Sequence, residues 1–413
     1  MPAGLWVTLV VGGLFAGLGV VAALSFPAGR EAIGGIASLT GFFLSAWALG
    51  RLTAIYGSSQ TPGIALGLVL AAVVGGYSLA SAMLPQAARR PSPRPITAAH
   101  GDRTALLLLS DAEGELYQPA AAALELVTLQ DDDVLELGIV ATPFLFAAQK
   151  ARYRAIGGSS PARRQVAEIA EALERTSPGL QVDHYGVAWC DGPGNLLERV
   201  EELARDGYSR FIVQPLAVAE SLEMHRAKSL VDRGRPDEAG IRVIYAPPLQ
   251  SAAAIAGLIA RRIAVGLADP ATTGIALVAH GQPESRTKLN PTFDEDESAF
   301  LNQIKMIATE DGMPASNVRL AWADWRDPDV TSTVRHLAAL GCTRILVSPA
   351  CYPVDGVSTL LDIPIGIKQA RVEPSVAIVT LSTWRDEPDV MRALREGAVE
   401  ALRELEEPSG ELA

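Results

Sequence analysis

Hydrophobic residues are concentrated in three long runs at the start of the chain, at residues 5–26, 32–50 and 63–84. About 20 apolar helical residues cross the hydrocarbon core of a bilayer. The runs are rich in Gly, Ala and Ser, which let helices approach closely in lipid. A cleaved signal peptide would need a basic segment ahead of the first run, yet residues 1–29 carry no charge. We therefore predict a membrane domain of three transmembrane helices at residues 1–85.

A different pattern begins after a Pro- and Arg-rich stretch at residues 86–103, which we interpret as a linker. From there, short apolar runs such as TALLLLS (104–110) alternate with amphipathic stretches such as SPARRQVAEIAEALERTS (160–177). Continuous apolar strands that alternate with helices are typical of parallel sheets covered on both faces. The predicted fold class is α/β, with three layers.

Two segments of this part resemble each other. DGYSRFIVQPL (206–216) and LGCTRILVSPA (340–350) each contain a Gly, a short polar turn, an Arg, an apolar strand and a Pro. We predict two similar halves at residues 104–245 and 246–405, followed by a flexible tail at 406–413. Ligands of open parallel sheets bind outside the carboxyl ends of the strands. His280 follows the apolar run GIALVA at one such end, and Asp111 is its counterpart in the first half.

The arginines that flank the apolar runs predict an orientation. Arg30 lies in the first loop, and Arg89, Arg90 and Arg94 follow the third run, whereas Arg51 alone lies in the second loop. Because cytoplasmic loops carry the excess of basic residues, the first loop and the large C-terminal part are predicted to be cytoplasmic. The protein is then a multi-pass protein of the cytoplasmic (inner) membrane, with its N-terminus outside.

Charge and cysteine content narrow the function. The net charge of −12 and the pI near 5.0 argue against a nucleic-acid partner. The chain has three cysteines, Cys190, Cys342 and Cys351, and no two of them have CxxC spacing. Three are too few for an all-cysteine iron–sulfur cluster held by one chain. They suit a reducing compartment, and we predict no iron–sulfur cluster.

Four motifs resemble those of the ferrochelatase family. KARYRAIGGSSP (150–161) resembles the signature K-x-x-Y-x-x-I-G-G-x-S-P, and DGYSRFIVQPL resembles the segment that comes after it. LVAHGQPES resembles the S-A-H-G-x-P motif, and YPVDGVSTLLDI (352–363) resembles D-H-x-E-T-L-Y-E-I. The resemblance covers residues 105–404, which is nearly the whole of the predicted α/β part.

The resemblance implies two α/β halves that hold a porphyrin, with Fe²⁺ and porphyrin as substrates and no tightly bound cofactor. It implies that His280 accepts the pyrrole protons or binds the metal, which suits an imidazole that is neutral near pH 7. The residues that it places at the substrate pocket are Tyr153, Gly157, Gly158, Ser159, Ser160 and Ser358.

The chain departs from the family pattern in the last motif. Gly356 stands at the position of the family's His, and Ser358 stands at the position of its catalytic Glu. Glu284 and Asp355 are candidate replacement carboxylates and metal ligands beside His280. We interpret the acidic run FDEDES (293–298) as the solvated start of the next helix, where the helix dipole favours negative charge.

This mixture of matches and departures supports two functions. The first is an enzyme, a membrane-anchored ferrochelatase-type lyase that inserts Fe²⁺ into a porphyrin for heme biosynthesis. The alternative is a catalytically degenerate chelatase-fold subunit of a membrane protein complex, which binds a tetrapyrrole or a partner protein. Both have a tetrapyrrole and the lipid bilayer as expected partners. Trp322 and Trp325 are candidates for stacking on the macrocycle or for packing in the core.

Overall fold

The computed structural model describes residues 2–57, 60–88, 92–96 and 101–406. The chain forms two compact units that interleave along the sequence. The first unit combines Met1–Arg90 with Leu116–Ser159, and the second combines Pro91–Glu115 with Ser160–Ala413. The residue bounds that we predicted for the membrane domain and for the two α/β halves stay a prediction.

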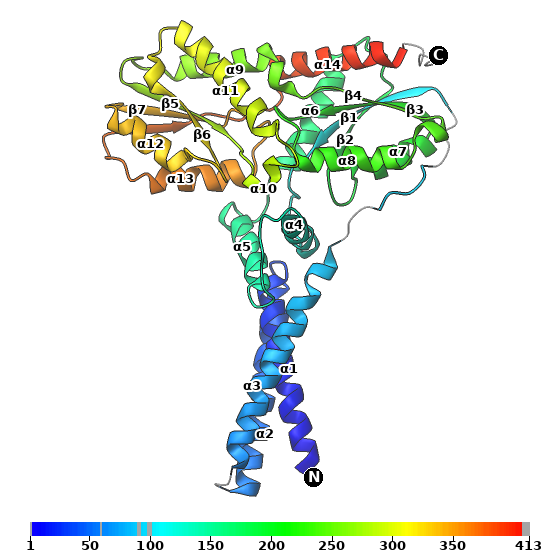
Figure 1. Cartoon of the computed structure of the whole chain (residues 1–413), viewed down its shortest axis with the longest axis vertical. Coiled ribbons are helices and arrows are strands. Elements are labelled where there is room, and N and C mark those ends of the chain that lie inside the picture. Colours follow the sequence, from blue (N-terminus) through cyan, green and yellow to red (C-terminus); the bar gives the residue numbers. More distant parts are fainter. Residues whose placement is uncertain (1, 58–59, 89–91, 97–100, 407–413) are drawn as a thin grey trace. The chain divides into compact units, whose positions relative to one another are not determined.

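Three long helices dominate the first unit (Figure 1). They are α1 (Pro2–Ser25), α2 (Glu31–Tyr56) and α3 (Thr61–Met83), and a short 3₁₀ turn, Pro85–Ala87, comes after α3. All three are long and apolar enough to cross a membrane, as the three hydrophobic runs predicted.

Glycines bring these helices into close contact. A Cβ atom on Gly17 would lie 2.1 Å from the Val73 carbonyl oxygen, and one on Gly34 would lie 2.3 Å from the Ala23 amide nitrogen. Such distances exclude any side chain, so α1 packs backbone to backbone against α2 and α3 at these points. The Ser45 hydroxyl adds a hydrogen bond of 3.0 Å to the Leu9 carbonyl oxygen between α1 and α2. Close packing and polar links of this kind hold helices together in lipid.

Two shorter helices complete the first unit, α4 (Pro119–Asp131) and α5 (Thr142–Ala155). They share a small core of Tyr117, Leu126 and Phe146. The Tyr117 hydroxyl donates a 2.8 Å hydrogen bond to the carbonyl oxygen of Ser25, the last residue of α1. The α4–α5 pair is therefore attached to the ends of the long helices, although it falls within residues 104–245, which we predicted as the first α/β half.

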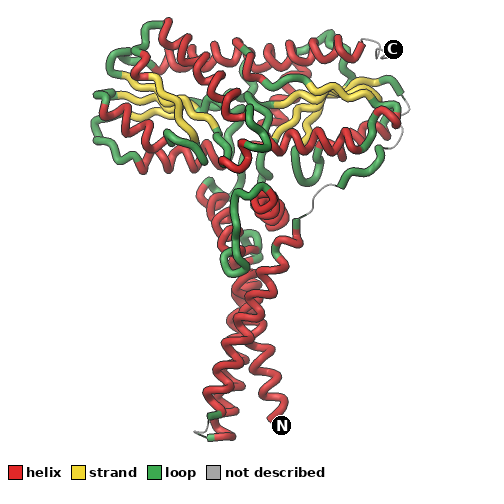
Figure 2. The backbone as a smooth tube through the Cα atoms, in the orientation of Figure 1, coloured by secondary structure: helices red, strands yellow, loops and turns green. Residues whose placement is uncertain are grey.

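The second unit contains two parallel four-stranded sheets (Figure 2). The first sheet has the order β2-β1-β3-β4 and the second has the order β6-β5-β7-β8. In chain order the strands are β1 (Arg103–Ser110), β2 (His184–Trp189), β3 (Tyr208–Pro215), β4 (Arg242–Tyr245), β5 (Thr273–Ala279), β6 (Val318–Trp322), β7 (Arg344–Ser348) and β8 (Ala377–Thr380). The central strands β1 and β5 are buried on both faces, which is why each reads as a continuous apolar run.

Helices cover both faces of each sheet, as the alternating pattern predicted. The helices of this unit are α6 (Ala162–Thr176), α7 (Leu196–Arg205), α8 (Leu222–Arg233), α9 (Ala253–Gly266), the single turn α10 (Glu284–Thr287), α11 (Phe293–Glu310), α12 (Val330–Ala339), α13 (Ile363–Gln369) and α14 (Pro388–Glu406). One apolar core includes Leu106 and Leu108 of the first sheet together with Ile275 and Leu277 of the second. The opposite face of each sheet has its own core. The α/β fold class is thus confirmed.

Candidate active site

His280 is the first residue after the central strand β5. The next residue, Gly281, has φ +80°, and a Cβ atom there would lie 2.5 Å from the Asp324 carbonyl oxygen. Only glycine fits this close backbone approach. The chain therefore turns sharply at the end of the strand and leaves the imidazole at its carboxyl end, where the sequence predicted a ligand site.

A buried carboxylate holds the histidine. The Glu297 Oε1 atom lies 2.9 Å from His280 Nδ1 and accepts the His280 backbone N–H at 3.2 Å. Its other oxygen accepts the Gly281 N–H at 3.1 Å. Three groups from the turn thus bind one carboxylate, whose side chain is only 1% exposed. The binding of Nδ1 leaves Nε2 as the ring nitrogen that can take a proton or a metal ion.

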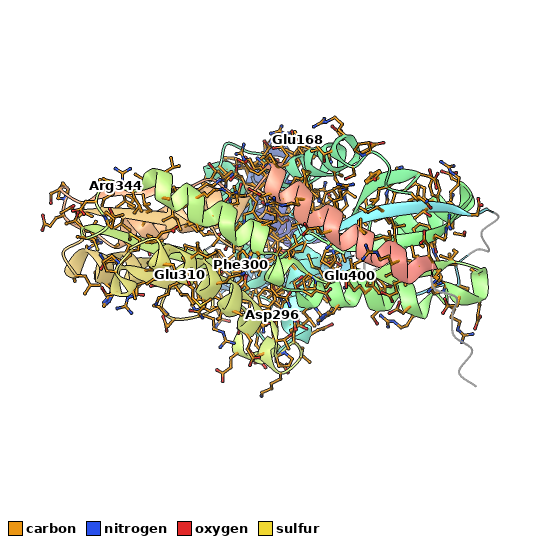
Figure 3. The ribbon with its side chains drawn as sticks, turned by 90° about the horizontal axis from the view of Figure 1, so that it is seen from above. Glu168, Asp296, Phe300, Glu310, Arg344 and Glu400 are labelled. Carbon is orange, nitrogen blue, oxygen red and sulfur yellow. The ribbon has the colours of Figure 1, made fainter. Side chains whose placement is uncertain are left out.

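Our interpretation of the acidic run FDEDES is therefore wrong for Glu297. Helix α11 buries Phe293, Glu297, Phe300, Leu301 and Ile304, a stripe with helical spacing. Glu297 occupies a core position of this stripe, while Glu295 beside it is exposed. Figure 3 shows α11 from above with Asp296 and Phe300 labelled. The signal that could have identified Glu297 is its place in the apolar stripe.

The surroundings of His280 raise its pKa above the ordinary value. Burial opposes the charged imidazolium, but the hydrogen bond and the negative charge of Glu297 favour it. The charges of Asp111 and Glu113 add to this effect. The net result is a base that binds its proton more tightly than a free imidazole does.

Two neighbours complete the surroundings of the pair. The Tyr352 ring lies against the imidazole, with 3.8 Å between ring centroids and a tilt of 36°. Burial raises the pKa of Cys351 well above its usual value, and the Glu297 charge and a hydrogen bond to Glu297 raise it further. A neutral thiol thus contacts Glu297, and a phenol ring packs against the imidazole of His280.

His280 and Glu297 line a pocket of about 180 Å³ together with Asp111, Glu223, Arg286 and Trp325. Arg286 forms a 2.8 Å ion pair with Glu223, and both side chains are mostly buried. Burial raises the pKa of Glu223, and the Arg286 charge opposes this shift. The pocket is smaller than the roughly 300–1,000 Å³ that encloses a drug-sized ligand. Its size suits a metal ion and one edge of a larger molecule.

The two candidate tryptophans have different environments. Trp322 ends β6 and is buried in the core, whereas Trp325 lines the pocket with 54% of its surface exposed. Trp325 also has φ +61°, a backbone conformation that is rare for a bulky residue. Of the two, Trp325 is thus the one placed where an aromatic face could contact a ligand of this pocket.

Four of the residues that the resemblance assigned to the substrate pocket lie in the first unit. Tyr153 of α5 packs edge-to-face on Tyr117, with ring centroids 6.2 Å apart. Gly157 and Gly158 have φ +92° and +95°, and the Gly158 N–H donates to the Tyr153 carbonyl oxygen at 2.8 Å. The glycines thus form a left-handed ending of α5. Ser159 comes next, in an isolated bridge to Leu116. Their role toward a substrate stays a prediction.

The segment that replaces D-H-x-E is held by a carboxylate from the first sheet. Glu113, just after β1, accepts the Val357 N–H at 2.8 Å and the hydroxyl of buried Ser160 at 2.5 Å. A Cβ atom on Gly356 would lie 2.6 Å from Glu113 Oε1, so the Glu113 carboxylate fills the space beside this glycine. Ser358 begins a π-helical turn, Ser358–Asp362. Glu113 thus occupies the space beside Gly356, from a position more than 240 residues earlier in the chain.

Within the part of the chain that the structure describes, neither candidate replacement carboxylate forms a hydrogen bond or an ion pair with His280. Asp355 forms an ion pair with Arg385 and accepts hydrogen bonds from Gln165 and Thr383 at 3.3 and 3.1 Å. Glu284 is exposed at the start of α10. In the described residues, no three or more His, Cys, Asp and Glu side chains gather around one point. The metal role of Glu284 and Asp355 stays a prediction.

The paired parallel sheets and a carboxylate-bound histidine at a strand end define a chelatase-like α/β protein. The family model described as Ferrochelatase matches residues 127–402, about two thirds of the chain. The chain therefore belongs to the ferrochelatase family, as its motifs indicated.

Curated relatives agree with this assignment. The chain is 28% identical over 251 residues to a ferrochelatase of Synechococcus sp. (strain JA-3-3Ab). This match covers 54% of this chain and 72% of the relative. The chain is 25% identical over 274 residues to a ferrochelatase of Herpetosiphon aurantiacus, covering 62% and 88%. Among solved structures, the sirohydrochlorin chelatase SirB from Bacillus subtilis subspecies spizizenii, in complex with cobalt, aligns with a TM-score of 0.47 and 11% identity, covering 73% of this chain and 96% of SirB.

Proposed function

We propose that this protein is a membrane-anchored ferrochelatase that inserts Fe²⁺ into a porphyrin, as one step of heme biosynthesis. The observation that carries the proposal is the His280–Glu297 pair, in which a buried carboxylate binds Nδ1 and leaves Nε2 for chemistry. This pair supplies the carboxylate that the motif around Ser358 lacks. The substrates are the metal ion and the porphyrin, and no further cofactor is needed.

The reaction requires a base and a path for two protons. A free-base porphyrin loses both pyrrole N–H protons as Fe²⁺ forms bonds to the four ring nitrogens, so each turnover releases two protons. His280 Nε2 accepts a pyrrole proton, and Glu297 stabilises the imidazolium that results. Asp111 at the mouth of the same pocket can pass the proton to water or attract the incoming cation. The Trp325 face offers an apolar surface to the macrocycle.

Metal insertion by the full-length protein, purified in detergent or nanodiscs, tests this function. Fe²⁺ or Zn²⁺ is supplied with protoporphyrin or coproporphyrin, and the metalloporphyrin is followed by absorbance. We expect His280→Ala to lower the rate by about 10²–10⁴-fold, the usual contribution of a general base. Glu297→Gln should also lower it, while Glu295→Gln, two residues away and exposed, should leave it unchanged. Equal rates in all four proteins would overturn the proposal.

A non-catalytic subunit is the second candidate, and one observation favours it. Gly356 and Ser358 stand where the family carries its His and Glu, and Glu113 fills the space beside Gly356. The α/β unit would then bind a tetrapyrrole without metallating it, and the long helices would contact other membrane subunits. Porphyrin binding that quenches the protein fluorescence, together with no turnover of any metal, would select this alternative.

We infer a location at the cytoplasmic face of the inner membrane, with the N-terminus outside. The support is the distribution of arginines around the three candidate spans, which favours a cytoplasmic first loop and C-terminal part. A Val265→Cys variant tests it, because this side chain is 88% exposed on α9. In intact cells an impermeant maleimide should label it only after lysis, and labelling before lysis would reverse the orientation.

A further inference from the structure

Helix α5 and the turn before it have an uneven distribution of charge. Residues 138–149, GIVATPFLFAAQ, contain no ionisable side chain, and then Lys150, Arg152 and Arg154 come within five positions. The helix is therefore apolar at its N-terminal end and basic at its C-terminal end. Such a pattern along the axis differs from the one-sided stripe of a helix that covers a soluble core.

Contacts within the first unit fix the basic end of α5 at the ends of the long helices. The Lys150 ammonium donates to the Ala23 carbonyl oxygen at 2.8 Å and lies 3.2 Å from the Glu31 carboxylate. Arg154 also forms an ion pair with Glu31. Ala23 is near the end of α1 and Glu31 begins α2, so this cluster marks the level at which the candidate spans end. Charged groups at that level lie among lipid headgroups.

The apolar end of α5 lies deeper along the same bundle. The Tyr77 hydroxyl donates a 2.7 Å hydrogen bond to the Val140 carbonyl oxygen, just before α5. Tyr77 precedes Met83, the end of α3, by six residues, which is about 9 Å along the helix axis. Figure 1 shows α5 beside the long helices, in agreement with these two contacts. The turn at Val140 is therefore level with the interior of a candidate span.

The outward surface of this end is apolar and uncovered. The exposed fractions of Ile139, Val140 and Phe144 are 51%, 68% and 60%. Along α5 the exposed face continues with Ala148, Ala151 and Ala155. In water such a patch would be unfavourable, at about 25 cal/mol per Å² of apolar surface.

We propose that α5 is a re-entrant membrane helix, whose apolar end and preceding turn (residues 138–148) are inserted among the acyl chains of the bilayer. Backbone groups at that depth need partners. The helix satisfies its own, the Val140 carbonyl is bound by Tyr77, and the Ala141 and Thr142 amides donate to the Gly138 carbonyl. The nearest preceding acid, Glu136, is three residues before Ile139, and extended chain of that length spans about 10 Å to the headgroups.

Site-specific fluorescence in lipid vesicles tests this insertion. The three native cysteines are buried, so Val140→Cys can be labelled selectively with an environment-sensitive nitrobenzoxadiazole dye. The full-length protein is reconstituted in phosphatidylethanolamine–phosphatidylglycerol vesicles that contain doxyl-labelled lipids. We expect a blue-shifted emission and quenching several-fold stronger than for Val265→Cys, an exposed valine of the α/β unit. Quenching equal to that of Val265→Cys would overturn the proposal.

A second position gives the direction of insertion and guards against a misfolded variant. Ala151→Cys lies at the basic end of α5, so its dye should be quenched best by lipids with a shallow doxyl group, whereas Val140→Cys should prefer a deep one. The reverse order contradicts a re-entrant helix. A Val140→Cys dye that responds to added protoporphyrin but not to doxyl lipids would assign this face to the tetrapyrrole instead. Neither readout depends on metal insertion.

Discussion

The two sheets of the α/β unit share one topology but differ in the path of the chain after their central strands. β1 and β5 each lie between the second and third strands of their sheet, and each ends at a pocket residue, Asp111 or His280. After β5 the chain stays in the unit and forms α11, which returns Glu297 beneath His280. After β1 the chain leaves for α4 and α5 of the first unit. The connection, and not the sheet, thus decides what chemistry each strand end acquires.

The carboxylates at the two strand ends illustrate this difference. Glu297 is buried and binds the three donors of the histidine turn. Asp111 is exposed, and Glu113 near it binds the Val357 amide and the Ser160 hydroxyl. One half therefore uses its carboxylate to set a base, and the other half uses its carboxylates to line the pocket and to hold the altered motif.

The largest expected effect is on stability, from removing the buried carboxylate. Glu297→Ala leaves the His280 and Gly281 amides and the imidazole without their acceptor, and each buried unsatisfied group costs about 1–3 kcal/mol. We expect the α/β unit to lose about 2–4 kcal/mol, measured as a fall of several °C in its thermal unfolding midpoint. Asp111→Ala, at an exposed position, should change the free energy of unfolding by less than about 0.5 kcal/mol.

Glu297→Gln is the matched control for this comparison. Its amide oxygen keeps one acceptor for the turn, but its NH₂ group then faces one of the turn's N–H donors, and the charge is lost. Part of the stability should therefore return, while the imidazolium loses its charged partner. Equal losses for Glu297→Ala and Asp111→Ala would show that the two strand ends do not differ in the way the geometry indicates.

A smaller effect should link Gly356 to Glu113. Gly356→Ala places a Cβ atom against the Glu113 carboxylate, and we expect a loss of about 1–3 kcal/mol from overpacking. In a Glu113→Ala background the same substitution should cost less, because the obstructing carboxylate is absent. Thermal unfolding of the four proteins gives the coupling energy, which we expect to be about 1 kcal/mol. Strictly additive losses would refute the idea that Glu113 occupies the space beside Gly356.

The sequence predicted the fold well because its signals are local. Three uncharged runs predicted the three long helices, and continuous apolar runs predicted buried parallel strands. It also predicted His280 at a strand end, because a polar residue directly after a continuous apolar run marks the point where the buried strand stops. The family resemblance also put the altered segment at residues 352–363 near His280, and Tyr352 of that segment stacks on the imidazole. The resemblance did not identify Glu113, the carboxylate that binds this segment.

The remainder of the site depends on contacts between distant residues. Glu113 meets Val357 across more than 240 positions, and no periodicity records such a meeting. Glu297 was misread because an acidic run resembles a solvated helix start, and the stripe that buries it is visible only once the helix register is known. The attachment of α5 to the long helices was missed because its ion pairs, such as Lys150 with Glu31, join separate parts of the sequence.

The smallest expected effect is a pH dependence that distinguishes the paired histidine from a free one. Because the folded pKa of His280 is raised above its unfolded value, the protonated pair stabilises the fold fully below about pH 6.5, and this stability is lost as pH rises through the folded pKa. The side chain is 42% exposed, so solvent screening should keep the effect below about 1 kcal/mol.

Metal insertion, which needs the neutral base, should instead increase as pH rises through the same pKa. Glu297→Gln should move the midpoint of the rate profile to lower pH, and NMR of the His280 ring should show the same shift. A midpoint that Glu297→Gln leaves in place, or that Glu295→Gln moves equally, would mean that the buried carboxylate does not set the base.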